Sequence, residues 1–116
     1  MTVRRLLLVA AMALEACAPS ADPSPVATTT VDLPRSYRFA PPTIQIPLGA
    51  TVTWTNSDNF THSIEFDGDP APGTVIAPGE STARTFGEPG TFAYLCAFHP
   101  QDMYGTVLVT IVPGSE

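Results

Sequence analysis

Apolar residues occupy every second position in several short runs between Arg35 and the C-terminus. Side chains of a β-strand point alternately to its two faces, so this spacing predicts strands with one buried face. Groups rich in Pro, Gly, Asn and Asp separate the runs and are typical of turns. The pattern predicts an all-β domain, a sandwich or barrel of short strands. The residues expected to face inward are Ile44 and Ile46, Val52 and Trp54, Ile64 and Phe66, then Phe92, Tyr94 and Cys96, and finally Val107, Val109 and Ile111.

The composition restricts the class of protein and its partners. With 44% hydrophobic and 14% charged residues, the 116-residue chain has enough apolar surface for one folded domain. It contains no lysine, and its formal net charge is -6. Proteins that bind nucleic acid neutralise phosphates with clustered Lys and Arg, so nucleic acid is not an expected partner.

The first residues resemble an export signal. Arg4 and Arg5 precede an apolar run over residues 6–14, which is far shorter than the ~20 residues needed to span a bilayer. We therefore expect residues 1–16 to be a signal peptide and the protein to be exported. Paired arginines also occur in twin-arginine signals, which export folded proteins, and the sequence leaves that route open.

Cys17 is the candidate attachment point for a lipid. Residues 14–17 resemble the lipobox of bacterial lipoproteins, although Glu15 stands where a small or apolar residue is usual. Lipidation would hold the protein at a membrane, in the bacterial periplasm or at the outer face of the cytoplasmic membrane. The alternative is cleavage after Ala18, which would discard the cysteine.

The remaining chain divides into a tether and a domain. Residues 17–34 consist mainly of Ala, Pro, Ser, Thr and Asp and carry too little bulky apolar surface to offset the entropy of ordering. We expect them to form a disordered tether. Residues 35–116 then form the folded domain.

Cys96 is the most informative residue of that domain. Its only possible disulfide partner is Cys17, which lies at the junction of signal peptide and tether. Cys96, His99 and Met103 place a thiolate, an imidazole and a thioether on one short loop. Soft ligands of this kind select copper, whereas hard cations prefer carboxylates and structural zinc usually has four Cys or His ligands.

A copper site for electron transfer needs a second imidazole, and the sequence offers one. Such a site combines two histidines and a thiolate with a weak axial thioether. His62 is the only other histidine and begins the strand predicted to run to Phe66. Taken singly, a Cys, a His or a Met is more often a packing residue than a metal ligand. All four satisfy one site together, so we predict that the set binds copper.

Four short motifs accompany these candidate ligands: residues 54–56, residues 90–92, the pair His99 and Pro100, and residues 105–109. They resemble the cupredoxin family of type 1 (blue) copper proteins, especially its plastocyanin-like and amicyanin-like members. The resemblance extends from about residue 37 to residue 112. It implies a Greek-key β-sandwich or barrel that binds one copper ion.

The resemblance also assigns roles to individual residues. It implies that His62, Cys96 and His99 are equatorial ligands, that Met103 is the axial ligand, and that the backbone N–H of Ser63 donates to the thiolate. The ligand loop departs from the family in one respect. Three residues separate His99 from Met103, whereas two or four are common. An axial oxygen donor from Gln101 is the alternative, but Gln101 follows His99 too closely.

The function implied by the resemblance is the transport of single electrons between a redox donor and an acceptor protein. A chaperone or buffer that handles Cu(I) outside the cytoplasm is the alternative. An enzyme is not expected, because four protein ligands leave no position open for a substrate. We expect a monomer. His99 would present its outer edge to partners near Pro100, within an apolar patch rimmed by Phe60, Ala97 and Phe98.

Overall fold

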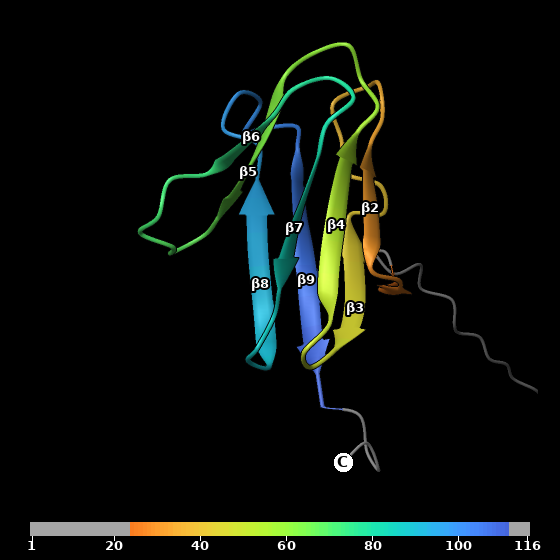
Figure 1. Cartoon of the computed structure of the whole chain (residues 1–116), viewed down its shortest axis with the longest axis vertical. Helices are drawn as coiled ribbons and strands as arrows, with labels where there is room; N and C mark the ends of the chain where they lie inside the picture. Colours follow the sequence, from red (N-terminus) through yellow and green to blue (C-terminus); the bar gives the residue numbers. More distant parts are fainter. Residues whose placement is uncertain (1–23, 112–116) are drawn as a thin grey trace, which may run out of the picture.

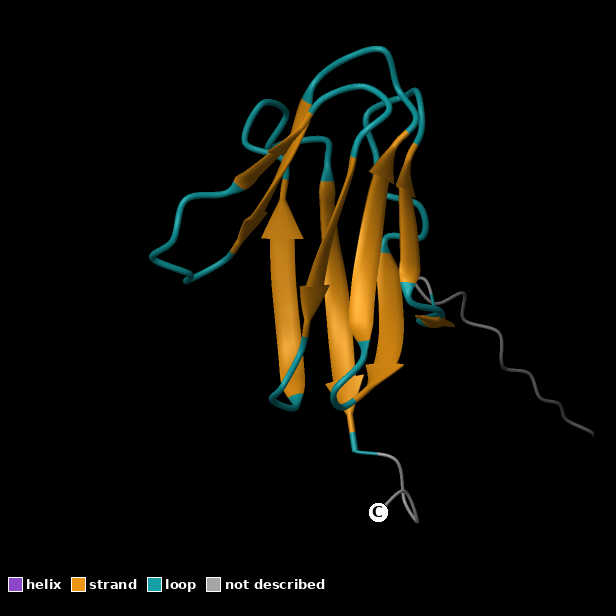
Figure 2. Ribbon diagram, viewed as in Figure 1, coloured by secondary structure: helices purple, strands orange, loops and turns teal. Residues whose placement is uncertain are grey.

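The computed structural model of the protein describes residues 24–111, which form an all-β domain (Figures 1 and 2). Within this range there is no helix long and apolar enough to cross a membrane. The strands are β1 (Val26–Ala27), β2 (Thr30–Leu33), β3 (Thr43–Pro47), β4 (Thr51–Asn56), β5 (His62–Phe66), β6 (Thr74–Ile76), β7 (Ser81–Thr85), β8 (Gly90–Leu95) and β9 (Tyr104–Thr110).

The strands form two sheets that pack face to face. A six-stranded sheet has the order β1-β3-β9-β8-β5-β6, and a three-stranded sheet has the order β2-β4-β7. The chain crosses between the sheets at each step from β2 to β5, so β2 pairs with β4 and β3 pairs with β9 in parallel. The smaller sheet lies against the larger one in Figure 1. The predicted all-β sandwich is confirmed.

The core lies between the sheets and consists of the side chains at every second position along each strand. Ile44 and Ile46 of β3 are almost fully buried, and so are Val52 and Trp54 of β4. The prediction that Ile111 faces the core is wrong, since this residue is 66% exposed. Strand β9 ends at Thr110, so Ile111 has left the paired part of the sheet.

The folded domain begins earlier than the sequence pattern predicted. Strands β1 and β2 lie within residues 17–34, which were expected to be tether. Val31 and Leu33 of β2 are 2% and 0% exposed and belong to the core. The alternation in β2 covers only four residues, which is too short a run to outweigh the surrounding Pro, Ser and Thr. The predicted signal peptide and Cys17 lie outside the described residues.

Four strands begin or finish at the same end of the sandwich. Strands β4 and β8 finish there and strands β5 and β9 begin there, at the upper end in Figure 2. Pairing of Glu65 with Leu95 leaves His62, at the start of β5, beyond the last residue of β8. The topology therefore brings His62 to the loop that follows β8.

Candidate metal centre

The loop between β8 and β9 is a compact turn held by its own backbone. The N–H of Cys96 donates to the carbonyl of Met103 at 3.0 Å, and the N–H of Met103 donates to the carbonyl of His99 at 2.9 Å. A third bond joins the N–H of His99 to the carbonyl of Cys96 at 3.2 Å. These bonds hold the three candidate ligands of the loop in a fixed spatial relation.

Two histidine nitrogens approach the sulfur of Cys96. The Sγ atom lies 3.8 Å from Nδ1 of His62 and 3.9 Å from Nδ1 of His99. One ligand atom from each residue lies within 4.8 Å of the other two. With metal–nitrogen and metal–sulfur bonds of about 2.0 and 2.3 Å, two donors on one ion stand roughly 3.6–3.9 Å apart. The observed separations therefore fit a single bound ion.

Burial distinguishes the candidate ligands. Cys96, His62 and Met103 are each 0% exposed, whereas His99 is partly exposed. A thiol, an imidazole and a thioether removed from water form a soft donor set, which suits copper. His99 is the member of the set that a partner protein can reach.

The sulfur of Cys96 also receives hydrogen bonds from the strand beside it. The backbone N–H of Ser63 approaches Sγ at 3.4 Å, as expected from the sequence, and the Ser63 hydroxyl lies 3.9 Å from it. The same hydroxyl accepts the N–H of Ala97 at 2.8 Å. Ser63 thus links β5 to the ligand loop and places donors against a thiolate.

The outer nitrogen of His62 contacts a carboxylate that the sequence pattern did not single out. Nε2 of His62 lies 2.9 Å from Oδ2 of Asp58, whose side chain is 3% exposed. The hydrogen bond from His62 lowers the pKa of Asp58, with a further contribution from the N–H of Asn59, while burial opposes it. Asp58 precedes His62 by four residues in a polar turn, where a carboxylate usually lies in water.

Asn56 holds that turn in place. Its side-chain amide is buried and donates to the carbonyls of Phe60 and Ile76, at 2.8 and 2.9 Å. Its Oδ1 accepts the N–H of Asp58 at 2.9 Å. All the hydrogen-bonding atoms of this amide are therefore used to shape the connection from β4 to β5, which carries Asp58.

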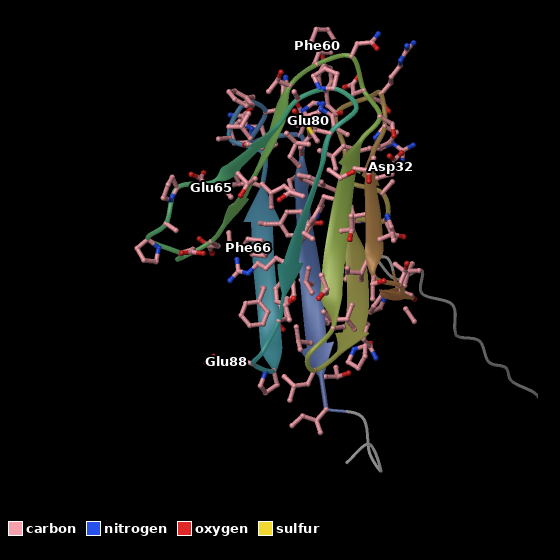
Figure 3. The ribbon with its side chains drawn as sticks, viewed as in Figure 1. Asp32, Phe60, Glu65, Phe66, Glu80 and Glu88 are labelled. Atoms are coloured by element: carbon pink, nitrogen blue, oxygen red, sulfur yellow. The ribbon has the colours of Figure 1, made fainter. Side chains whose placement is uncertain are left out.

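Partly exposed aromatic side chains lie near His99. Phe60 and Phe98 are 56% and 53% exposed, and Phe60 lies at the upper end of the molecule in Figure 3. The ring of Tyr37 lies 4.4 Å from the ring of His99 and 6.0 Å from that of Phe60. Tyr37 has a φ of 53°, a left-handed conformation that the sequence alone does not indicate.

Comparison with known proteins identifies relatives of this chain. Residues 27–110 match the family model for copper binding proteins of the plastocyanin/azurin family. Amicyanin-alpha of Methylorubrum extorquens is 32% identical over 106 residues, which cover 87% of this chain and 84% of that protein. Plastocyanin of Scenedesmus fuscus is 37% identical over 83 residues, covering 61% of this chain and 85% of that protein.

A solved structure shows the same fold. A purple cupredoxin from Nitrosopumilus maritimus superimposes with a TM-score of 0.65 at 27% identity, covering 72% of this chain and 100% of that one. The family match includes every candidate ligand, and the ligand cluster fits one copper ion. The chain therefore belongs to the plastocyanin/azurin family of copper-binding proteins, and copper is its cofactor.

Proposed function

We propose that the protein is an exported type 1 copper protein that carries single electrons between a redox donor and an acceptor protein. The observation that carries the proposal is the approach of two histidine Nδ1 atoms to one buried cysteine sulfur. Copper bound there supplies one-electron exchange between Cu(II) and Cu(I). The four proposed ligands are His62, Cys96, His99 and Met103.

The protein contributes a rigid and dry surrounding for the ligands. The backbone bonds of the β8–β9 loop and the donors of Ser63 hold Cys96 in one position. Little rearrangement of the protein is then required when the charge of the site changes. A site with four protein ligands also leaves no position for a substrate, which favours a carrier over an enzyme.

His99 is the proposed point of contact with redox partners. It is the partly exposed member of the ligand set, and Phe60, Phe98 and Pro100 give its surroundings an apolar surface. An apolar surface is desolvated easily when two proteins dock. We expect Phe98→Glu to slow electron self-exchange between the Cu(I) and Cu(II) forms at least about tenfold, because like charges would face each other.

Ile111→Glu provides the matched control for this experiment. Ile111 is 66% exposed and follows the far end of β9, away from the ligand loop. It introduces the same charge at a distance from His99, and we expect the self-exchange rate to change little. Equal slowing by both variants would show that net charge, rather than the surface around His99, governs the rate.

The copper site itself is tested by adding Cu(II) to the full chain and to Cys96→Ser. An electron carrier shows an intense visible band from thiolate to copper and reversible one-electron voltammetry, and Cys96→Ser shows neither. A colourless chain that binds only Cu(I) and yields it to a chelator would instead identify a copper chaperone or buffer. That outcome would contradict the proposed function.

Export and membrane attachment complete the proposal. The arginines and apolar run of residues 1–16 support export, and Cys17 within its lipobox-like sequence supports lipidation. Growth with a labelled fatty acid should label the native chain in a bacterial host but not Cys17→Ser. Recovery of the native chain without label and without Cys17 would show ordinary cleavage instead.

A further inference from the structure

Asp58 is a buried acidic residue that touches His62 on the side away from Cys96. We propose that Asp58 is a positioning residue, which holds His62 in the tautomer that leaves Nδ1 free for copper and lowers the reduction potential of the site. The inference rests on the proposed function, since it concerns the same copper site. It adds a residue that is not itself a ligand.

The two nitrogens of His62 face different partners. Nδ1 faces the sulfur of Cys96 at 3.8 Å, and Nε2 faces Oδ2 of Asp58 at 2.9 Å. A neutral imidazole carries a hydrogen on one nitrogen only. An ionised carboxylate accepts hydrogen bonds and cannot donate them, so Asp58 favours the hydrogen on Nε2. Nδ1 is thereby left with the lone pair that a metal requires.

Asp58 is itself fixed by the turn that carries it. Its Oδ1 accepts the N–H of Asn59 at 2.7 Å, and its backbone N–H is bound by Oδ1 of Asn56 at 2.9 Å. With both carboxylate oxygens engaged and its side chain 3% exposed, Asp58 has little freedom to turn away. Partners of this kind orient metal-binding histidines, and their loss commonly costs 10- to 100-fold in metal affinity or activity.

The charge of Asp58 acts in a setting where water screens it poorly. Asp58 and His62 are both buried, so the interaction between the carboxylate and a nearby ion is stronger than at the surface. A negative charge favours the more positive oxidation state, Cu(II), over Cu(I). The expected consequence is a reduction potential lower than that of the same site without the carboxylate.

The other histidine has a different environment. Among residues 24–111, no carboxylate is hydrogen-bonded to His99, whose ring instead lies beside that of Tyr37. The two imidazoles therefore have different partners. His62 is hydrogen-bonded to the buried carboxylate of Asp58, and His99 packs against the ring of Tyr37. Asp58 contacts the buried histidine of the pair and not the partly exposed one.

Asp58→Asn separates charge from geometry in the copper-loaded full chain. The Asn carbonyl still accepts from Nε2, so the visible band should persist while the reduction potential rises. We expect about a tenfold change in the relative affinity for Cu(I) and Cu(II), which corresponds to about 59 mV for one electron. Asp67→Asn, in the exposed turn after β5, removes an equal charge and serves as the control. A shift no larger than that of Asp67→Asn would overturn the proposal.

A second measurement does not need copper. Nitrogen-15 NMR of the metal-free native chain should show His62 with its hydrogen on Nε2, and Asp58→Ala should give a mixture of tautomers. Asp58→Glu should largely restore the native spectrum. Native His62 with its hydrogen on Nδ1 would overturn the proposal even if every variant failed to fold. Failure of the proposed function is a distinct result, because the native chain would then show no blue band.

Discussion

The ring of Tyr37 lies 4.4 Å from the ring of His99, at an interplanar angle of 40°. Tyr37 belongs to the connection between β2 and β3, which is distant in sequence from the β8–β9 loop. The contact joins the β2–β3 connection, which leaves the smaller sheet, to the partly exposed His99. It gives His99 a neighbour that limits the motion of its ring.

Replacement of Tyr37 should therefore loosen His99. We expect Tyr37→Ala to lower the free energy of unfolding by about 0.5–1.5 kcal/mol, the usual contribution of an aromatic pair, and to broaden the NMR signals of the His99 ring in the Cu(I) form. Tyr37→Phe keeps the ring and should behave like the native chain. Phe98→Ala, which also removes an exposed aromatic ring, should leave the His99 signals sharp. Equal broadening in both alanine variants would contradict a specific role for Tyr37.

Asn56 should be essential to the turn that carries Asp58. Asn56→Ala removes the partners of the Phe60 and Ile76 carbonyls and of the Asp58 N–H, all near the copper site. An unpaired buried polar group costs about 1–3 kcal/mol, so we expect a loss of at least that size in chemical denaturation. Asn59→Ala, in the exposed part of the same turn, is the control. A loss of similar size in both variants would show that the buried amide has no special importance.

Gly105 should tolerate no side chain. A Cβ atom at this position would lie 2.6 Å from the ring of Tyr94 and 3.0 Å from the carbonyl of Pro42. We expect Gly105→Ala to destabilise the protein by about 1–3 kcal/mol, measured by denaturant titration, because buried rings and backbone have to move. At Gly87 a Cβ would meet nothing within 4 Å, so Gly87→Ala should cause no such loss. Native stability in Gly105→Ala would mean that Tyr94 moves freely.

Tyr94 should make the protein sensitive to alkali. Its ring is 2% exposed, and burial raises the pKa of Tyr94 to about 12, while the nearby Trp54 opposes this rise. The unfolded chain releases this proton near pH 10, so the folded state holds the extra proton between about pH 10 and 12. The stabilisation is complete below pH 10 and declines as the pH rises, by up to about 3 kcal/mol.

Tyr94→Phe tests this dependence. The Tyr94 hydroxyl is buried and has no hydrogen-bond partner among the described residues, so its removal should cost little at pH 7. The stability of Tyr94→Phe should fall less than that of the native chain between pH 10 and 12 in denaturant titrations. Tyr104→Phe, at a residue that is 64% exposed, should retain the native decline. An identical decline in all three proteins would refute the assignment to Tyr94.

Met103 should tune the copper rather than hold the fold. It is 0% exposed, and Leu has a similar volume, so Met103→Leu should cost less than about 1.5 kcal/mol in the metal-free chain. If the Met103 thioether binds copper as proposed, its loss would remove a donor that favours Cu(II). The reduction potential should then rise by at least about 59 mV, a tenfold change in relative affinity. If voltammetry gives an unchanged reduction potential, Met103 packs in the core but does not bind copper.

Much of the fold and of the candidate site could be predicted because the deciding interactions are local. Period-two alternation placed Ile44, Ile46, Val52 and Trp54 in the core, since a strand turns every second side chain to the same face. The alternation wrongly extended β9 to Ile111, because it does not report where pairing with a neighbouring strand ends. It missed β2, because a run of four residues is too short to outweigh the Pro, Ser and Thr around it.

The sequence by itself determined the chemistry of the site. Cys96, His99 and Met103 lie on one short loop, so their proximity follows from chain connectivity, and a soft donor set of this kind suits copper. Tertiary structure decided what surrounds that loop. His62 reaches Cys96 through the pairing of β5 with β8, and Tyr37 reaches His99 across the sandwich. Asp58 became a buried partner of His62 because the Asn56 amide folds its turn inward. Such contacts depend on strand register and burial, which act between segments that are distant in the chain.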